Sequence, residues 1–384
     1  MVTAASVVIV AGAVTGVVSV LSAEREGRDG PSTVRGSVAV DRPHGAVAAG
    51  RDQPRRPSAR GRTAATAAPA RTAATPLPAR TGTDQPTTAV PPLLYRHPGS
   101  QALDWVRAHP DDPRTAVIAS KITDRPAAVW FTDPDADTIA AGVRAVTAAA
   151  AAQERVPVLV PYTIPDRDCG GASRGGAPDL AAYDAWIDAF ARGLGPREVI
   201  VVLEPDSIAQ SGCLTPADRS ARFASLARAG RVLKAADPRA RVYYDAGHSG
   251  WNPPAEQAAL LRRAGAADAD GVFSNVSNFR TTADEIAYDR QVLDALGGPA
   301  SLGAVIDTSR NGNGAPPDGR WCDPTGRRIG RAPTLETGQA RIDAYLWVKP
   351  PGESDGCAGA AGTFLPSYAY DLARGDAASP VPVS

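Results

Sequence analysis

Two acids end an apolar run at residues 201–210, whose sequence is VVLEPDSIAQ. Glu204 and Asp206 flank a proline directly after Val-Val-Leu, at a place where a buried strand would stop. Two carboxyl groups at such a position could bind a metal ion, transfer a proton or cap a helix. The residues at the ends of the other apolar runs decide between these possibilities.

Further apolar runs along the chain also end in polar or aromatic side chains. The residues at or just beyond their ends are Trp130, Tyr162 with Asp168, Asp245 with His248, Asn275 with Asn278, Asp307, and Lys349 with Glu353 and Asp355. One polar residue after a strand carries little information. Such residues after nearly every strand form a constellation that the fold must bring together.

The elements that position these side chains alternate along the chain. Apolar runs lie at 127–131, 156–162, 199–206, 241–247, 271–278, 302–307 and 344–350, and helical patterns at 135–155, 179–194, 216–236, 255–266 and 281–296. Nearly continuous apolar runs are typical of strands covered on both faces. Strand alternating with helix predicts an α/β fold with a parallel sheet. About seven parallel strands favour a distorted (β/α) barrel, with an active-site cleft at the C-terminal strand ends.

Several kinds of chemistry find little support. Of the four histidines only His248 would lie at the barrel mouth, and the cysteines form no CxxC pair, so we expect no metal site. An all-oxygen Mg²⁺ or Ca²⁺ site remains an alternative without a loop signature. The sequence contains no GxSxG motif that would support a serine nucleophile, and Ser207 has no evident histidine partner. The sequence contains no GxGxxG or GxxxxGK[ST] motif, which would indicate nucleotide binding, so we expect no cofactor. A net charge of zero argues against a nucleic-acid partner.

Carboxyl groups combined with aromatic side chains suit glycoside hydrolysis. That reaction needs one acid to protonate the leaving oxygen and a second group to handle water. Trp130, Trp251 and Trp321 fall at strand ends or in the loops that follow, where an indole could hold a sugar ring. The other tryptophans, Trp105, Trp186 and Trp347, lie within helix or strand patterns and are expected in the core.

Six blocks of the chain, in order, resemble glycoside hydrolase family 6, the inverting β-1,4-glucanases. They are VPYTIPDRDCGG, VVLEPDSIAQ, YYDAGHSGW, SNVSNF, RWCDPTGRRIG and WVKPPGESDG, and the resemblance covers about residues 93–374. It implies a hydrolase, a cellulase that acts in polysaccharide degradation, with a β-1,4-glucan as its partner.

The resemblance also implies roles for individual residues. Asp206 matches the general acid, Asp355 the residue taken as the base, Asp168 the carboxylate that supports the acid's pKa and the transition state, and Tyr162 the tyrosine that distorts the sugar ring. Substrate-binding positions match Trp130, Ser173, Asp245, His248, Trp251, Asn278, Trp321, Lys349 and Glu353. Structural alternatives stay open: Glu204 as a hydrogen-bonded structural acid, Asp245 as a buried acceptor, Asp355 as a purely electrostatic group, and Asp168 in an ion pair with Arg167.

Short segments beside the site favour attack within chains. Cys357 comes two residues after Asp355, and the segment after Cys169 is also short, so no long loop can cover the cleft. We therefore expect an endoglucanase. The alternatives are a cellobiohydrolase that acts at chain ends and a non-catalytic glucan-binding protein on the same scaffold.

Four cysteines suggest two disulfides. Pairing in sequence order joins Cys169 to Cys213 and Cys322 to Cys357, and family 6 members form two disulfides at the matching positions. Each bridge would restrain the unfolded chain by roughly 3–4 kcal/mol.

The N-terminal quarter of the chain differs from the rest. Residues 1–23 are apolar and are predicted to be a signal peptide or a signal anchor. Residues 24–92 are rich in Ala, Pro and Arg and are predicted to be a disordered linker. Residues 93–384 would form the catalytic domain. We expect a monomer that is secreted, or tethered to the cell surface if residues 2–23 are not cleaved.

Overall fold

The computed structural model of the protein describes residues 93–374. The predicted signal segment, the predicted linker and residues 375–384 of the predicted catalytic domain lie outside the described residues. In the described part of the chain, no helix is both long enough and apolar enough to cross a membrane.

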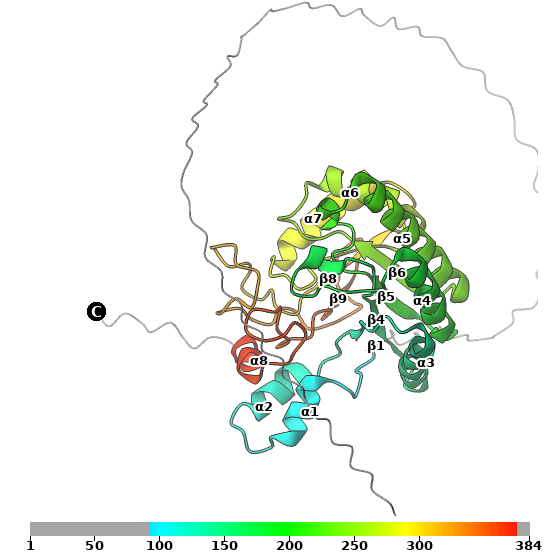
Figure 1. Cartoon of the computed structure of the whole chain (residues 1–384). Helices are drawn as coiled ribbons and strands as arrows, with labels where there is room; N and C mark the ends of the chain where they lie inside the picture. The colour runs from blue at the N-terminus through cyan, green and yellow to red at the C-terminus, as the bar shows by residue number, and fades with distance from the viewer. Residues whose placement is uncertain (1–92, 375–384) are drawn as a thin grey trace, which may run out of the picture. The chain divides into compact units, whose positions relative to one another are not determined.

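Seven parallel strands form one curled sheet, with neighbours in chain order (Figure 1). They are β2 (Val129–Phe131), β4 (Val158–Pro161), β5 (Val199–Leu203), β6 (Ala240–Asp245), β7 (Gly271–Ser274), β8 (Gly303–Asp307) and β9 (Ile342–Leu346). A separate parallel pair joins β1 (Leu93–Leu94) to β3 (Arg155–Val156). Every predicted apolar run overlaps one strand of the large sheet, although β6 and β9 begin one and two residues earlier than predicted, so the predicted α/β fold with about seven parallel strands is confirmed.

Helices cross over between successive strands and cover the outer face of the sheet (Figure 1). They are α3 (Ala136–Ala152), α4 (Leu180–Gly193), α5 (Pro216–Ala236), α6 (Pro254–Arg263) and α7 (Thr282–Leu296). The predicted cap at Thr215 is present, since its side chain accepts a hydrogen bond from the Asp218 amide. Asp179 caps α4 in the same way. Local capping therefore fixes where these helices begin.

The barrel remains open between β2 and β9. The edge of β9 is occupied at Tyr345, which exchanges two backbone hydrogen bonds of 2.8 and 2.9 Å with Thr334. Across the gap, the Ala128 amide donates to the Trp347 carbonyl oxygen at 2.9 Å. The Trp130 indole N–H donates to the Val348 carbonyl oxygen at 2.7 Å. We call this junction the seam. At the seam β2 and β9 do not pair as neighbouring strands, and this is how the barrel departs from a closed one, as the prediction of a distorted barrel implied.

Two apolar layers hold the barrel together. The outer layer fills the space between sheet and helices and includes Trp186, Phe190 and Val201. The inner layer fills the barrel and includes Val160, Tyr243 and Phe273. Alternate side chains of one strand serve the two layers, because successive residues point to opposite faces. This is why the strands read as continuous apolar runs.

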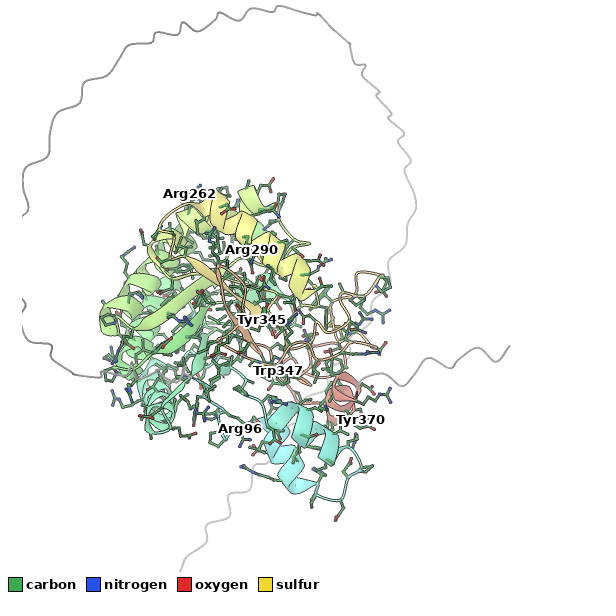
Figure 2. All side chains as sticks on the ribbon, turned by 180° about the vertical axis from the view of Figure 1, so that it is seen from behind. Arg96, Arg262, Arg290, Tyr345, Trp347 and Tyr370 are labelled. Carbon is green, nitrogen blue, oxygen red and sulfur yellow. A yellow bond between two sulfur atoms is a disulfide. The ribbon has the colours of Figure 1, made fainter. Side chains whose placement is uncertain are left out.

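A small helical lobe lies beside the barrel and was not predicted. It consists of α1 (Gln101–Ala108), α2 (Thr115–Ile118), a π-helical turn η1 (Ala119–Thr123) and α8 (Pro366–Ala373). Its own apolar cluster includes Ile118, Ile122 and Ala369. Figure 2 shows Tyr345 and Trp347 between this lobe and the helices that carry Arg262 and Arg290. The lobe brings residues from both ends of the described chain to one side of the barrel mouth.

Candidate active site

A cavity of about 690 Å³ opens at the carboxyl ends of the strands. Its lining includes predicted site residues from the ends of four strands or the segments that follow them: Trp130, Tyr162, Asp168, Ser173, Asp206, Lys349, Glu353 and Asp355. Asp245, His248, Trp251, Asn278 and Trp321 are not part of this lining. The constellation expected from strand ends thus comes together in large part around one cavity.

Asp206 stands on a strained turn directly after β5. Glu204 and Asp206 have φ values of 50° and 68°, which residues other than glycine seldom adopt. The turn closes with the Ser207 amide donating to the Glu204 carbonyl oxygen at 3.2 Å. Burial raises the pKa of Asp206 well above its usual range, and the nearby Asp245 and Asp168 carboxylates raise it further. Asp206 is therefore suited to hold a proton.

Asp245 supports this turn from behind. Its Oδ2 accepts hydrogen bonds from the amides of Ile208 at 3.0 Å and Ala209 at 2.8 Å, and its Oδ1 accepts from Gly247 at 2.9 Å. The carboxyl group is buried. It acts on Asp206 through position and charge, in keeping with the buried-acceptor alternative for Asp245.

Glu204 is a structural acid. Its two carboxyl oxygens accept hydrogen bonds from the amides of Thr163 and Ile164, both at 3.0 Å. The side chain is fully buried, and burial raises its pKa to about 7. Glu204 thereby joins the end of β5 to the loop after β4, which leads to Asp168.

Asp168 lies in a tight left-handed turn within η2 (Arg167–Gly170). Its Oδ2 accepts a hydrogen bond from the Ser173 amide at 2.8 Å. A side chain at Gly171 would place its Cβ 2.5 Å from the same oxygen, so this position requires glycine. The disulfide Cys169–Cys213 links the turn to the segment after Asp206. The disulfide thereby keeps Asp168, in the loop after β4, near Asp206, in the turn after β5.

Arg167 packs inside the same loop and makes no ion pair with Asp168. Its Nε donates to the Ser173 carbonyl oxygen at 2.8 Å, and Nη1 donates to the Tyr162 carbonyl oxygen. Its guanidinium lies over the Tyr162 ring, 4.8 Å from the centroid. Among residues 93–374 the ion pairs do not include Arg167–Asp168, so the structural alternative for Asp168 finds no support.

Asp355 is held by a buried ion pair. Its Oδ2 accepts from Arg310 Nη1 at 2.8 Å and from the Asp323 amide at 3.0 Å, while its Oδ1 lies 3.8 Å from Lys349 Nζ. The side chains of Arg310 and Asp355 are 0% and 3% exposed. Although burial alone would lower the pKa of Arg310, the Asp355 carboxylate raises it. The guanidinium of Arg310 therefore stays charged, and it fixes the Asp355 carboxyl group at the cavity wall.

Asp323 organises the short segment around Asp355. Its carboxyl oxygens accept hydrogen bonds from the amides of Asp355, Cys357 and Ala358 at 2.6, 3.0 and 2.8 Å, and from the Ser354 hydroxyl at 2.6 Å. Burial alone would raise the pKa of Asp323, but these hydrogen bonds lower it. The disulfide Cys322–Cys357 closes the same segment.

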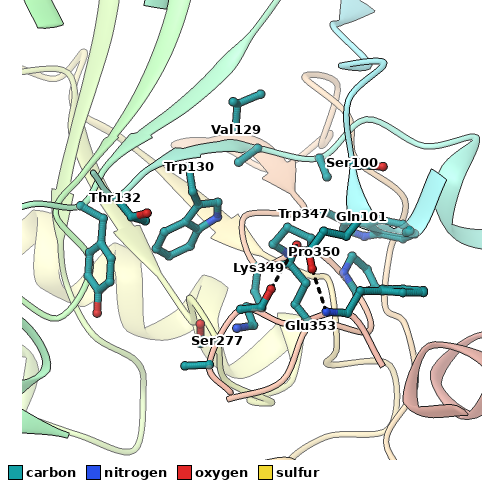
Figure 3. Close-up of a pocket in the computed structure, with 18 of the residues that line it drawn as sticks. Ser100, Gln101, Val129, Trp130, Thr132, Ser277, Trp347, Lys349, Pro350 and Glu353 are labelled. Carbon is teal, nitrogen blue, oxygen red and sulfur yellow. Dashed lines mark hydrogen bonds between the residues drawn. The ribbon is translucent and has the colours of Figure 1, made fainter. Parts of the chain in front are cut away.

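Aromatic rings form one side of the cavity (Figure 3). The rings of Trp130 and Tyr162 meet edge to face, with centroids 5.1 Å apart. Burial raises the pKa of the Tyr162 hydroxyl, so it stays protonated and can donate a hydrogen bond. Further along, Glu353 Oε1 accepts from Gln101 Nε2 at 3.3 Å, and burial raises the pKa of Glu353 to about 7. Gln101 comes from α1 in the lobe, so the lobe completes the cavity wall.

His248 and Trp251 form a separate pair on the loop after β6. Their ring centroids lie 5.2 Å apart, and Trp251 is 36% exposed. His248 Nδ1 accepts from the Gly250 amide at 3.1 Å, and burial lowers the pKa of His248 to about 4. The ring is neutral at ordinary pH. Trp321 is 53% exposed and does not line the cavity.

Sequence reasoning missed three residues that build the site: Arg310, Asp323 and Gln101. Asp307, which ends β8, was noted but received no role. It accepts hydrogen bonds from the amides of Ser309 and Lys349 at 2.9 and 3.0 Å, and so joins the turns after β8 and β9. Arg310 follows Asp307 by three residues, so its place after a strand end was a usable signal. The described residues contain no group of three His, Cys, Asp or Glu side chains arranged to hold a metal.

Comparisons with known proteins agree with one another. The family model described as Glycosyl hydrolases family 6 matches residues 88–383. Endoglucanase 1 of Streptomyces sp. (strain KSM-9) is 50% identical over 296 residues, which cover 76% of this chain and 81% of that protein. Endoglucanase A of Thermobispora bispora is 48% identical over 75% of this chain, and the match spans 63% of that protein.

A solved structure shares the fold. The endoglucanase Cel6 from Mycobacterium tuberculosis, solved with methyl-cellobiosyl-4-deoxy-4-thio-β-D-cellobioside, superposes with a TM-score of 0.70 at 40% identity. The match covers 74% of this chain and 97% of that one.

Proposed function

Since the chain belongs to glycosyl hydrolase family 6 and is thus a glycoside hydrolase of the cellulase class, we propose that it cleaves internal β-1,4-glucosidic bonds with inversion. One observation supports this most: Asp206 lies in the cavity with a pKa raised by burial and by two neighbouring carboxylates. A carboxyl group that keeps its proton near neutral pH can act as a general acid.

Asp206 supplies the proton in this proposal. As the bond between the anomeric carbon and the glycosidic oxygen breaks, the Asp206 proton moves to that oxygen and Asp206 becomes a carboxylate. Asp168 does not hand over a proton. Its negative charge disfavours early ionisation of Asp206 and stabilises the positive charge that develops on the sugar ring.

Water attacks the anomeric carbon from the opposite face and loses a proton. Asp355 is the carboxylate that would receive this proton, directly or through a second water molecule. Its ion pair with Arg310, at 2.8 Å, fixes the carboxyl group in place and occupies Oδ2. On either route the proton taken from the water passes through solvent after product release, and Asp206 takes up a proton from solvent, so the starting charges are restored.

The aromatic wall positions the sugar. The Trp130 ring offers a face on which a glucose unit can stack, and its edge-to-face contact with Tyr162 fixes both rings. Lys349 and Glu353 line the same region and can hydrogen-bond to sugar hydroxyls. Four further predicted binding residues lie outside the cavity lining: His248, Trp251, Asn278 and Trp321. We propose that they contact glucose units beyond the cavity.

Endo action follows from the short segments around the site. Three hydrogen bonds to Asp323 and one disulfide hold residues 354–358 close to the barrel. The loop after Asp168 is likewise fixed by Cys169–Cys213. Neither segment can fold over the cleft, and a polymer can enter from the side.

The test combines a variant with two product assays. We expect Asp206→Asn to lower kcat on carboxymethylcellulose by about a thousandfold or more, while binding of cellotetraose is retained. The parent enzyme should release α-anomers, detected by proton NMR, and should lower viscosity much faster than it produces reducing ends.

Each result can contradict one part of the proposal. An active Asp206→Asn variant would remove Asp206 from its role. Release of β-anomers would exclude inversion. A slow fall in viscosity with rapid release of cellobiose would identify a chain-end enzyme, and binding without turnover in the parent would identify a glucan-binding protein.

We also propose that the chain acts outside the cytoplasm as a monomer. Support comes from the apolar composition of residues 2–23 and from the two disulfides, which form in oxidising compartments. Cell fractionation of the full chain with N-terminal sequencing of the product distinguishes release from tethering, and light scattering of the released form gives its mass.

A further inference from the structure

Helix α7 carries two fully buried acids that the proposed reaction does not use. Glu285 and Asp289 lie one helical turn apart, so both side chains share one face of α7. Both side chains are 0% exposed. Neither lines the cavity of the proposed active site.

Each carboxyl group accepts one hydrogen bond of its own, and both lie near the Ser274 side chain, which lowers the pKa of each against the rise that burial causes. Glu285 Oε1 accepts a hydrogen bond from the Ser249 amide at 2.9 Å. Asp289 Oδ2 accepts from the Ser274 hydroxyl, at the end of β7, also at 2.9 Å. Among the described residues, Glu285 Oε2 and Asp289 Oδ1 find no hydrogen-bond donor. Each acid therefore has one satisfied oxygen and one buried oxygen that lacks a donor.

A shared proton removes this deficit. Two ionised carboxylates only accept hydrogen bonds, and an unsatisfied buried acceptor costs about 1–3 kcal/mol. If one acid is protonated, its O–H can donate to the free oxygen of the other, so both free oxygens gain a partner. The pair then carries one negative charge in place of two.

The surrounding charges fit a singly charged pair. Arg280, after β7, is the cation that acts on Glu285. It lies against the loop that holds Ser249, because a Cβ at Gly250 would come within 2.1 Å of Arg280 Nη2. One negative charge on the pair balances this guanidinium.

Two further titratable side chains beside the pair, Tyr288 and His248, are neutral, while Asp245 is a third acid that acts on Tyr288. Tyr288, on the same helix, donates from its hydroxyl to the Ala246 carbonyl oxygen at 3.1 Å, and burial raises its pKa. His248 lies across the loop with a pKa lowered to about 4 by burial and by Arg280. Neither residue supplies a second charge to the pair.

We propose that Glu285 and Asp289 share one proton, and that the pair positions the loop His248–Trp251 through the Ser249 amide. The inference rests on the proposed function in one respect, namely that His248 and Trp251 contact the glucan. α7 holds this loop at two points, Ser249 through Glu285 and Ala246 through Tyr288. The pair is a positioning device and does not touch the reacting atoms.

The directions of the pKa shifts agree with this geometry. Burial raises the pKa of both acids, and the Glu285 carboxylate raises that of Asp289 further. A carboxyl whose pKa is raised on folding loses its contribution to stability as pH rises through the folded-state pKa. The shared proton is therefore most stabilising on the acid side and is lost on the alkaline side.

Replacing Glu285 by glutamine tests the shared proton. In Glu285→Gln the amide oxygen can still accept from Ser249, and the amide nitrogen donates permanently to Asp289 Oδ1. Melting temperatures are measured from about pH 5 to about pH 9. The melting temperature of the variant minus that of the parent should increase by roughly 4 °C or more as the pH rises across this range. Glu256→Gln, an exposed acid on α6, is the matched control and should run parallel to the parent.

Loss of the loop contact is tested by Glu285→Ala. This variant should melt lower than Glu285→Gln at every pH, and hydrogen exchange of residues 248–252 should become faster. Its KM for cellohexaose should rise about fivefold with kcat nearly unchanged, because lost uniform binding appears in KM. Glu285→Gln should keep the KM of the parent. If Glu285→Gln does not fold, Asp289→Asn provides the same donor from the other side.

The outcomes separate this inference from the proposed function. If the difference in melting temperature between Glu285→Gln and the parent does not change with pH, the proposal of a shared proton is wrong. Unchanged exchange of residues 248–252 in Glu285→Ala would overturn the positioning role. Both measurements work without a substrate, so they stand even if the parent enzyme hydrolyses no glucan.

Discussion

At the scale of single residues, the acids of this protein are separated by what they contact. Asp206 faces the cavity with carboxylates behind it and beside it, so it tends to keep a proton. Asp355 forms a buried ion pair with Arg310 at 2.8 Å. Glu204 and Asp245 are acceptors for backbone amides and hold turns in place. The same residue type thus serves as acid, anion or support according to its neighbours.

Asp168→Asn should change the pH dependence of the reaction. The Asp168 charge raises the pKa of Asp206, and activity requires protonated Asp206, so kcat/KM falls as pH rises through that pKa. Removing the charge lowers the pKa of Asp206, and the alkaline limb of the profile should move to lower pH. The profile is measured on a soluble glucan, with Asp111→Asn, an exposed acid, as control. An alkaline limb that stays in place in Asp168→Asn would show that the Asp168 charge does not act on the acid.

At the scale of elements, the crossovers are joined to one another by few but specific contacts. Glu204 connects the end of β5 to the loop after β4, and Asp307 connects the turns after β8 and β9. Cys169–Cys213 connects the Asp168 turn to the segment after Asp206. These links keep the mouth of an incomplete barrel in one arrangement.

Removing one of these links should affect chemistry as well as stability. In Cys169→Ser/Cys213→Ser the Asp168 turn loses its covalent link to the segment after Asp206 and is held by hydrogen bonds alone, such as those of Arg167 and Arg222. We expect kcat to fall about tenfold, because a small displacement of Asp168 weakens its effect on Asp206. The free energy of unfolding should fall by roughly 3–4 kcal/mol. Urea unfolding and single-turnover kinetics measure the two effects, and full kcat in a destabilised variant would contradict the positioning role of the bridge.

The elements that the sequence predicted are those with local signals. Each strand of the large sheet overlaps a predicted apolar run, and α5 begins at Pro216 after the Thr215 cap and ends at Ala236, as expected. In the lobe, α1 does carry a local signal, the Ser100 cap, which was overlooked, whereas α2 is four residues long and starts without a side-chain cap. Arg310 and Asp323 were missed as site residues because their meaning depends on Asp355, 45 and 32 residues away. Contacts between distant segments have no local pattern to reveal them.

At the scale of the whole molecule, buried acids should set the pH range of stability. Burial raises the pKa of Glu204 to about 7, from about 4.5 when unfolded, so folding favours its protonated form. The associated stability is complete at low pH and is lost as pH rises from about 4.5 to about 7.

Glu204→Gln should flatten this dependence. An amide stays neutral at every pH, so the decline in melting temperature between about pH 5 and about pH 8 should be smaller than in the parent. The comparison is made by scanning calorimetry, with Glu336→Gln, an exposed acid, as control. A decline as steep in Glu204→Gln as in the parent would show that Glu204 is not protonated in the folded protein.

The seam has a consequence for protein engineering. The indole of Trp130 gives its N–H to the Val348 carbonyl oxygen and offers its face to the cavity. A phenylalanine or tyrosine at this position would keep a stacking surface but lose the bond that draws the two edges of the barrel together. Both the affinity for sugar and the stability of the fold therefore depend on the Trp130 side chain. Attempts to retune substrate preference should begin at Gln101 and Glu353, whose contact lies in the outer wall and can be redesigned without opening the barrel.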